Sequence, residues 1–267
     1  MYMRILIFII LTLVVLGSTG CSQQPSPEGV SAMELKSIAE KTIFFGHQSV
    51  GWNIIQGIEE MVKEQPGAPL KIRQAESIDG TLGPAIIHTD IGKNYDPMSK
   101  LRAFEQFVRT GVGGQADIAF FKFCYVDFDK NTDVDHLFAA YKQTMTDLSA
   151  TYPQTTFVYV TAPLTAPDQG VKALLKNLLG RNDAALANLK RNQFNELVRR
   201  EYAGKAALFD LAMIEATYSD GRVCSISVDT QTVPCLVDAY TDDGGHLNAS
   251  GRQVVAARLL KFLANLD

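Results

Sequence analysis

The chain has 267 residues, 46% of them hydrophobic, and a formal net charge of −4 at pH 7. This length is enough for one large domain with a full core, or at most two small ones. The charge is mildly acidic, and no basic stripe with interleaved aromatic residues occurs, which argues against nucleic acid as a partner.

The N-terminal segment is typical of an export signal. A short basic start precedes an apolar stretch over residues 5–17, which is too short for a comfortable membrane span. The Thr-Gly-Cys ending resembles a bacterial lipoprotein signal, in which the cysteine, here Cys21, is lipidated. This resemblance predicts a signal over residues 1–21, a polar tether over 22–32, and a membrane-anchored protein of the cell envelope with its domain over 33–267. The alternative is a plain cleaved signal.

Strands and helices alternate along the rest of the chain. In chain order, the hydrophobic patterns predict a strand over 42–45, a helix over 51–63, a strand over 70–75, an irregular loop over 80–95, a helix over 97–110, a strand over 117–123, a helix over 134–152, a strand over 156–161, a helix over 184–203, a short strand over 207–210 and a helix over 251–266. This alternation predicts an α/β domain, a three-layer α/β/α sandwich around a mostly parallel sheet.

Three cysteines follow the signal. Cys224 and Cys235 are plausible disulfide partners that close a hairpin-like loop in an oxidising compartment. Cys124 follows an apolar run and is expected to be a buried small hydrophobe. No C-x-x-C or H-E-x-x-H spacing is present, so neither a zinc site nor another metal or organic cofactor is expected.

A Gly-rich loop before the last helix carries a pair of residues suited to acid–base chemistry. Asp243 and His246 are three positions apart in the stretch "TDDGGHLNASG". A serine hydrolase needs an imidazole to take the proton of the serine hydroxyl and a carboxylate to orient that imidazole. Turn chemistry is the alternative role for Asp243, and Asp242 is a weaker rival for the orienting role.

The block D-G-x-H-L-N-x-x-G resembles the last block of the SGNH (GDSL-like) hydrolases, which are α/β/α esterases and deacetylases. That family carries its nucleophile directly after the first strand, where this chain has "FFGHQSVG" with Ser49 as its only serine. The resemblance therefore implies a catalytic triad of Ser49, His246 and Asp243. The alternative for Ser49 is an N-cap of the following helix.

The resemblance also implies an oxyanion hole. A glycine of the second block, Gly83 with Gly80 as the alternative, would donate a backbone N–H group. The third block falls on "FFKFCYVDF", where Val126 stands at the position of the family's donor asparagine and cannot donate. Candidates for the missing oxyanion donor or for substrate contact are His47, Gln48, Asn53 and Asn94. His88 is a further residue that could line a pocket.

The resemblance implies hydrolysis of an acyl ester, with an O-acetyl group on a carbohydrate or envelope polymer as a candidate substrate. The substrate would be a small-molecule or polysaccharide ester. A catalytically inactive or repurposed fold that binds an envelope glycan is the main alternative. Acyl transfer to a polysaccharide would use the same triad.

Overall fold

The computed structural model describes residues 29–78, 80–167 and 183–266, so Cys21 and the predicted signal lie outside the described residues. A parallel sheet of six strands forms the centre of the molecule, in the order β2-β3-β1-β4-β5-β6. Its strands are β1 (Thr42–His47), β2 (Ile72–Gln74), β3 (Ala85–Asp90), β4 (Ile118–Phe121), β5 (Thr156–Val160) and β6 (Leu208–Phe209).

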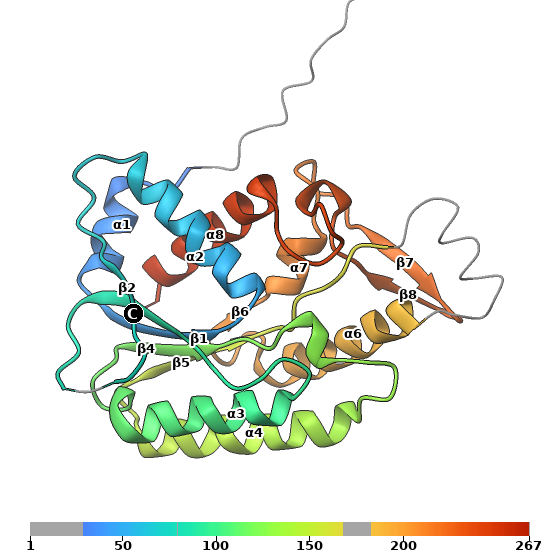
Figure 1. Cartoon of the computed structure of the whole chain (residues 1–267), viewed down its shortest axis with the longest axis horizontal. Helices are drawn as coiled ribbons and strands as arrows, with labels where there is room; N and C mark the ends of the chain where they lie inside the picture. The colour runs from blue at the N-terminus through green and yellow to red at the C-terminus, as the bar shows by residue number, and fades with distance from the viewer. Residues whose placement is uncertain (1–28, 79, 168–182, 267) are drawn as a thin grey trace, which may run out of the picture.

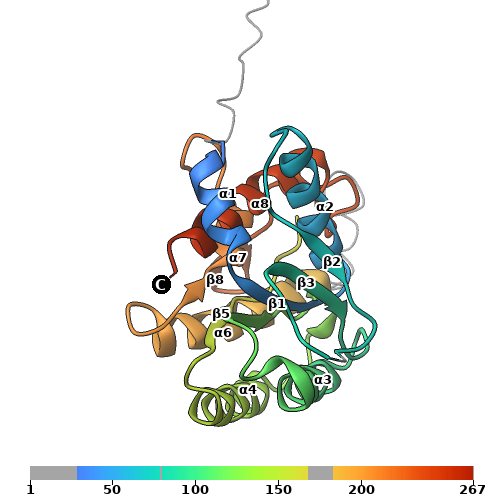
Figure 2. The ribbon, with the colours of Figure 1, turned by 90° about the vertical axis from the view of Figure 1, so that its left-hand side faces the viewer.

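Helices cover both faces of the sheet, as Figures 1 and 2 show. The described helices are α1 (Ala32–Ala39), α2 (Val50–Lys63), α3 (Pro97–Phe107), α4 (Val134–Thr151), α6 (Asp183–Tyr202), α7 (Leu211–Ala216) and α8 (Ala249–Ala264). Helices α1, α2, α7 and α8 lie on one face, and α3, α4 and α6 lie on the other. The predicted three-layer α/β/α fold is confirmed.

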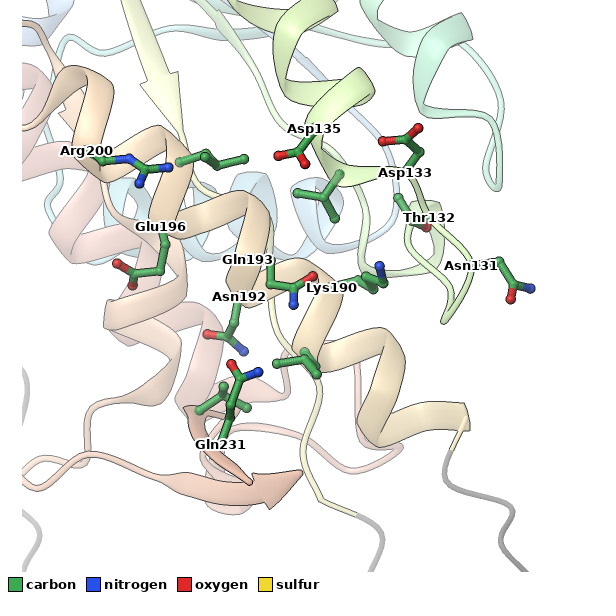
Figure 3. A pocket seen from close by; sticks show the side chains of 14 residues that line it. Asn131, Thr132, Asp133, Asp135, Lys190, Asn192, Gln193, Glu196, Arg200 and Gln231 are labelled. Carbon is green, nitrogen blue, oxygen red and sulfur yellow. The ribbon is translucent and has the colours of Figure 1, made fainter. Parts of the chain in front are cut away.

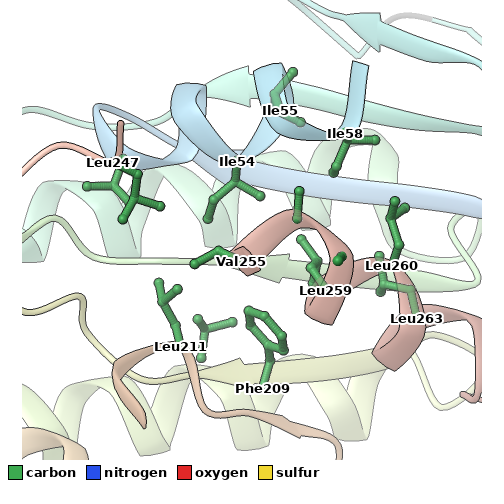
Figure 4. Close-up of a cluster of buried hydrophobic side chains, with 14 of the residues drawn as sticks. Ile54, Ile55, Ile58, Phe209, Leu211, Leu247, Val255, Leu259, Leu260 and Leu263 are labelled. Atoms are coloured by element: carbon green, nitrogen blue, oxygen red, sulfur yellow. The ribbon is translucent and has the colours of Figure 1, made fainter. Parts of the chain in front are cut away.

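The two faces of each strand contribute to separate hydrophobic cores, because successive side chains of a strand point to opposite sides. In β1, Ile43 and Phe45 join the core under α2 and α8, whereas Phe44 joins the core against α3 and α4. Figure 4 shows the first core, in which isoleucines of α2 meet leucines of α8. A strand that is buried on both faces requires a continuous apolar run, which explains the sequence of β1.

The region over 80–95 departs from the predicted loop. Strand β3, with the sequence AIIHTD, lies within it and pairs with β1 along its whole length. Gly80, Gly83 and Pro84 mark only the turn before the strand, and they obscured the apolar run that follows. Helices α1 and α7 were also not predicted.

Two smaller features complete the fold. Val30 is buried and Ser31 caps α1, so packing begins within the segment that was predicted as a tether. The predicted Cys224–Cys235 disulfide is confirmed and closes the hairpin of β7 (Ser225–Val228) and β8 (Gln231–Pro234). Within the described ranges, no helix has both the length and the apolar character needed to span a bilayer.

Candidate active site

Ser49 lies at the topological switch point of the sheet. Strand β1 is flanked by β3 on one side and by β4 on the other. Strands β2 and β3 therefore lie on one side of β1, and the strands from β4 onward lie on its other side. In open α/β sheets, the crevice at the carboxyl ends of the strands around such a point is the usual ligand site. Ser49 follows β1 by two residues, so its side chain is placed at this crevice.

The backbone at Ser49 adopts a sparsely populated conformation, with φ 54° and ψ −112°. Such a conformation costs on the order of 1–3 kcal/mol for a residue with a side chain and is typical of functional turns. Although Ser49 occupies the N-cap position of α2, its side chain makes no capping hydrogen bond. The role of a simple helix cap, which the sequence left open, is therefore contradicted.

Gly51 permits the tight turn between β1 and α2. A Cβ atom at this position would lie 2.3 Å from the Cβ of His47, so any side chain would clash with the histidine beneath the helix. The absence of a side chain lets the first turn of α2 start directly above β1. As a consequence, Ser49 lies in the short turn between the end of β1 and the start of α2.

The hydroxyl of Ser49 contacts the loop that carries His246 and Asp243. Ser49 Oγ lies 2.8 Å from His246 Nε2, and His246 Nδ1 lies 2.6 Å from Asp243 Oδ2. The backbone N–H groups of Gly245 and His246 donate to Asp243 Oδ1 at 2.9 and 2.8 Å. The structure thus brings together the three residues predicted from two blocks that are nearly two hundred positions apart.

The loop that carries Asp243 and His246 is also hydrogen-bonded to helix α2. The N–H of Leu247 donates to Asn53 Oδ1 at 3.1 Å, which fixes the loop beside the nucleophile turn. The side-chain oxygen of Asn53 therefore accepts a hydrogen bond that positions this loop. Asp242, the rival to Asp243, instead accepts a hydrogen bond from Asn248 Nδ2 at 3.1 Å, so it is directed away from the imidazole.

The charge of Asp243 is stabilised by its hydrogen bonds. Partial burial raises the pKa of this carboxyl, but the ring of His246 and the backbone N–H groups of Gly245 and His246 outweigh that effect and lower the pKa to about 2. Asp243 is therefore ionised throughout the neutral range. An ionised carboxylate at Nδ1 favours the tautomer that leaves Nε2 free to accept the serine proton.

Tyr125 is a site residue that the sequence analysis did not assign a role. Its hydroxyl lies 3.4 Å from His246 Nδ1, and its ring meets the imidazole edge-on with centroids 5.5 Å apart. Gly245 is a glycine for this reason, because a Cβ there would lie 2.5 Å from the phenol ring. Arg191 donates to the carbonyl of Tyr125 at 2.8 Å and supports this packing from behind.

Gln48 has a structural role that differs from the predicted one. Its Nε2 donates to the carbonyls of Ile91 and Gly92 at 3.1 and 2.7 Å, so both amide protons tie the nucleophile turn to the loop after β3. Its own carbonyl accepts a hydrogen bond at 2.8 Å from Nζ of Lys122, a buried lysine at the end of β4. The structure contradicts the prediction that this side chain contacts the oxyanion or the substrate.

His47 is also removed from the crevice. It is fully buried, its Nε2 lies 3.0 Å from His88 Nδ1, and Trp52 covers both rings edge-on. Burial, together with the charge of Lys122 and with His88, lowers the pKa of His47 to about 2, so its ring is neutral. The expected substrate contact at His47 is contradicted, and His88 is buried against the edge of Trp52.

Gly83 and Gly80 lie at the wrong end of the sheet for an oxyanion hole. Ala85 pairs with Thr42 at the amino end of β1, whereas Ser49 follows the carboxyl end. A strand rises about 3.3 Å per residue, so the six residues of β1 separate these glycines from Ser49 by about 20 Å. The predicted role of Gly83 is therefore contradicted, because the missed strand β3 shifts the relevant turn to residues 91–94.

That turn contains groups that suit an oxyanion hole. Among the described residues, the backbone N–H groups of Ser49 and Gly92 have no hydrogen-bond acceptor. Asn94 Oδ1 accepts from Lys100 Nζ at 2.9 Å, and this leaves the Nδ2 group of Asn94 as an available donor. Asn94 is the one residue predicted as a third donor whose side chain stays exposed at this edge.

A buried ion pair supports the turn. Lys100 Nζ lies 2.7 Å from Asp127 Oδ2, and both side chains are fully buried. The carboxylate of Asp127 also accepts from the backbone N–H groups of Cys124 and Tyr95, which joins the loop after β3 to the loop after β4. Over residues 29–78, 80–167 and 183–266, no group of three or more metal-ligating side chains is arranged to hold a metal ion.

Comparison with known proteins gives similarity at the level of structure. No protein-family model matches the chain, and no curated relative is found. Among solved structures, a lipolytic protein of the G-D-S-L family from Veillonella parvula has 12% identity and a TM-score of 0.49, with 84% of this chain and 98% of that chain covered.

Two esterases are also similar. The acetyl xylan esterase AlAXEase has 17% identity and a TM-score of 0.48, with 82% of this chain and 97% of that chain covered. An acetylxylan esterase from Geobacillus stearothermophilus has 10% identity and a TM-score of 0.46, with coverage of 86% and 96%. These structural neighbours are hydrolases of the SGNH/GDSL kind, the kind that the Asp-x-x-His block resembles. The fold assignment itself follows from the strand order and the layers.

Proposed function

We propose that this protein is a serine ester hydrolase of the SGNH type. The observation that carries the proposal is the continuous chain of hydrogen bonds from Ser49 Oγ through His246 to Asp243, with heavy-atom distances of 2.8 and 2.6 Å. A nucleophile within hydrogen-bond reach of a base, and a third group that orients the base, is the arrangement that activates a hydroxyl. The strained turn at Ser49 supports the same reading.

In the proposed reaction, His246 Nε2 takes the hydroxyl proton as Ser49 Oγ attacks the ester carbonyl. The resulting imidazolium is stabilised by the carboxylate of Asp243 and then gives the proton to the departing alcohol. Water attacks the acyl-enzyme in the second half of the reaction, and His246 again serves as base and then acid. The acid product leaves and Ser49 recovers its proton.

The oxyanion would be held by donors of two loops. We assign this role to the backbone N–H groups of Ser49 and Gly92 and to Nδ2 of Asn94, because these donors are available among the described residues at this edge. Asn94 would then replace the donor that Val126 cannot supply. Loss of one such donor typically lowers kcat by about 10²–10³-fold. Asn94→Ala should show a loss of this size, whereas Asn131→Ala, in an exposed loop, should not.

Hydrolysis of p-nitrophenyl acetate by the purified protein tests the proposal. Ser49→Ala and His246→Ala should each abolish turnover, and the matched changes Ser250→Ala and His136→Ala, at exposed helical positions, should leave it intact. Full activity in Ser49→Ala would identify a different nucleophile. A wild-type protein with no activity on any acyl ester would favour a binding role for the fold.

We further propose that the protein is an exported lipoprotein anchored through Cys21. The lipoprotein-like ending of the N-terminal segment motivates this proposal, and the disulfide between Cys224 and Cys235 supports export to an oxidising compartment. Metabolic labelling with a radioactive fatty acid should mark the wild type and not Cys21→Ser. Equal labelling of both proteins would contradict the anchor.

A further inference from the structure

Helix α6 buries a stripe of polar side chains at helical spacing. Its members, each at most 3% exposed, are Asn188, Arg191, Asn192 and Asn195. Buried amides and guanidinium groups are costly unless they are hydrogen-bonded, so such a stripe indicates specific partners. The neighbouring Lys190 and Gln193 line a hollow of about 610 Å³ between α6, β8 and the start of α4, as Figure 3 shows, and Arg191 is not among its lining residues.

The stripe holds the segment that follows β5. Residues 162–166 are neither helix nor strand, so their backbone groups need other partners. Asn195 Oδ1 accepts from the N–H of Ala162 at 2.7 Å, and its Nδ2 donates to the carbonyl of the same residue at 2.9 Å. Asn188 Oδ1 accepts from the N–H of Thr165 at 3.2 Å. Side chains of α6 therefore fix the path of this segment.

Arg191 joins this segment to the loop after β4. Its Nη2 donates to Thr165 Oγ1 at 2.6 Å, its Nη1 donates to the carbonyl of Tyr125 at 2.8 Å, and its Nε donates to Asn188 Oδ1 at 3.3 Å. Burial lowers the pKa of Arg191 to about 10, so the guanidinium stays charged at neutral pH. A planar group with five donors can reach several acceptors at once, which the single ammonium group of a lysine does not.

Both of the joined segments contact the catalytic loop, residues 241–247. The N–H of Ala166 donates at 2.9 Å to the carbonyl of Gly244, which lies between the two catalytic residues of that loop. The hydroxyl of Tyr125 lies 3.4 Å from His246 Nδ1, and the two rings meet edge-on. The buried arginine thus fixes the two segments that hold the catalytic loop, without contacting the triad itself.

We propose that Arg191 is a positioning residue for the proposed hydrolysis. By fixing Thr165 and Tyr125, it holds the catalytic loop where His246 faces Ser49. This inference rests on the proposed esterase function and adds a residue that acts on the triad from a distance. A purely structural arginine would stabilise the packing of α6 and leave the reaction rate of the folded protein unchanged.

The kinetic test separates these two roles. Arg191→Lys keeps the charge but not the several donors, so kcat on p-nitrophenyl acetate should fall about 10- to 100-fold with little change in KM, because small displacements of catalytic groups are costly in rate. Thr165→Val, which removes one acceptor, should lower kcat by a smaller factor. The double variant should resemble Arg191→Lys, because both changes break the same link. Wild-type kcat in Arg191→Lys, or losses that multiply in the double variant, would overturn the proposal.

Arg199→Lys is the matched control in the same helix. Arg199 donates to Asp210 and Glu196, and neither of these is hydrogen-bonded, among the described residues, to the catalytic loop or to residues 162–166. Its replacement should lower stability in urea titrations and leave kcat at the wild-type value. A loss of kcat as large as that of Arg191→Lys would show that any damage to α6 slows the reaction, and would overturn the specific role of Arg191.

A spectroscopic test works without turnover. The ¹⁵N chemical shifts of the imidazole nitrogens, read through the ring C–H protons, report which nitrogen carries the proton, and His246→Ala identifies the signals of His246. Wild type and Arg199→Lys should show the proton on Nδ1, whereas Arg191→Lys should show a mixture of tautomers. Identical shifts in all three proteins would contradict the positioning role. A wild type that shows these shifts but hydrolyses no ester would instead refute the esterase function.

Discussion

Lys122 Nζ lies 2.8 Å from the carbonyl oxygen of Gln48, the residue directly before Ser49. Lys122 is buried at the end of β4, and burial lowers the pKa of its ammonium group. The same ammonium also contacts the carbonyl of Phe123 and the thiol of Cys124. One buried cation therefore joins the loop after β4 to the strained turn that presents the nucleophile.

Replacement of this cation tests whether it positions Ser49. Lys122→Met keeps most of the buried apolar stem and removes the hydrogen bond to Gln48. Hydrogen bonds to charged groups contribute about 1.5–3 kcal/mol, so kcat should fall about 10- to 100-fold if that energy holds the turn. KM for a small ester should change little. A variant with lowered stability but wild-type kcat would assign Lys122 a purely structural role.

Asp243 is expected to act through the tautomer of His246. Asp243→Asn removes the negative charge at Nδ1, and the corresponding change in Ser-His-Asp hydrolases lowers kcat by about 10⁴-fold. Asp242→Asn, at an exposed neighbour whose partner is Asn248, is the matched control and should retain activity. Equal losses in the two variants would show that the loop and not the orienting carboxylate was damaged.

The free energy of unfolding should depend on pH through the titration of Glu215. Complete burial raises the pKa of this carboxyl from 4.5 to about 8, against the opposing effects of Leu164 N–H, Lys122 and Arg191. Between pH 4.5 and 8 the folded state holds a proton that the unfolded state has lost. The free energy of unfolding therefore falls as pH rises through this window, by about 1.4 kcal/mol per pH unit.

Glu215→Gln removes that titration and can still accept the hydrogen bond from Leu164 N–H. Relative to the wild type, the variant should gain stability steadily from pH 5 to pH 8 in urea titrations. His47 works in the opposite direction, because its pKa falls from 6.5 to about 2 and the unfolded state alone takes up a proton below pH 6.5. A difference between variant and wild type that is independent of pH would contradict a protonated Glu215.

The disulfide between Cys224 and Cys235 should stabilise the domain. The two cysteines are 11 positions apart, and closure of a loop of that length corresponds to about 3 kcal/mol in the chain-entropy model. The double change to Ser should lower the free energy of unfolding by about that amount in urea titrations. Cys124→Ala, which removes the free buried thiol, serves as the comparison. Unchanged stability of the double variant would indicate that the hairpin is held by its other contacts.

Much of the fold could be predicted from the sequence because buried parallel strands and amphipathic helices have distinct patterns. Residues 43–45 of β1 are apolar on both faces of the strand and are followed by helical spacing, so both elements were recognisable. Strand β3 was missed because a cluster of glycines precedes it and its His88 and Thr89 are buried polar residues. Pattern rules treat such residues as loop signals.

The failure to predict strand β3 also explains why the predicted oxyanion donor was wrong. Asp243, His246 and Ser49 could be assigned because their roles depend on residue type and local spacing. The oxyanion donors depend instead on which turn lies beside the carboxyl end of β1. Because strand β3 was missed, the prediction placed this turn at Gly83, whereas in the structure it is at Gly92. The role of Tyr125 arises from contact with Gly245, which is 120 positions away and leaves no local signal.

The most direct measurement of the central claim is covalent labelling by a fluorophosphonate, a reagent that phosphonylates a serine only when its hydroxyl is activated. Intact-mass analysis of the wild type should show addition of one phosphonyl group, and peptide mapping should locate it on Ser49. His246→Ala should slow the labelling by several orders of magnitude. Labelling at another serine, or no labelling of the folded wild-type protein, would contradict the assignment of Ser49 as the nucleophile.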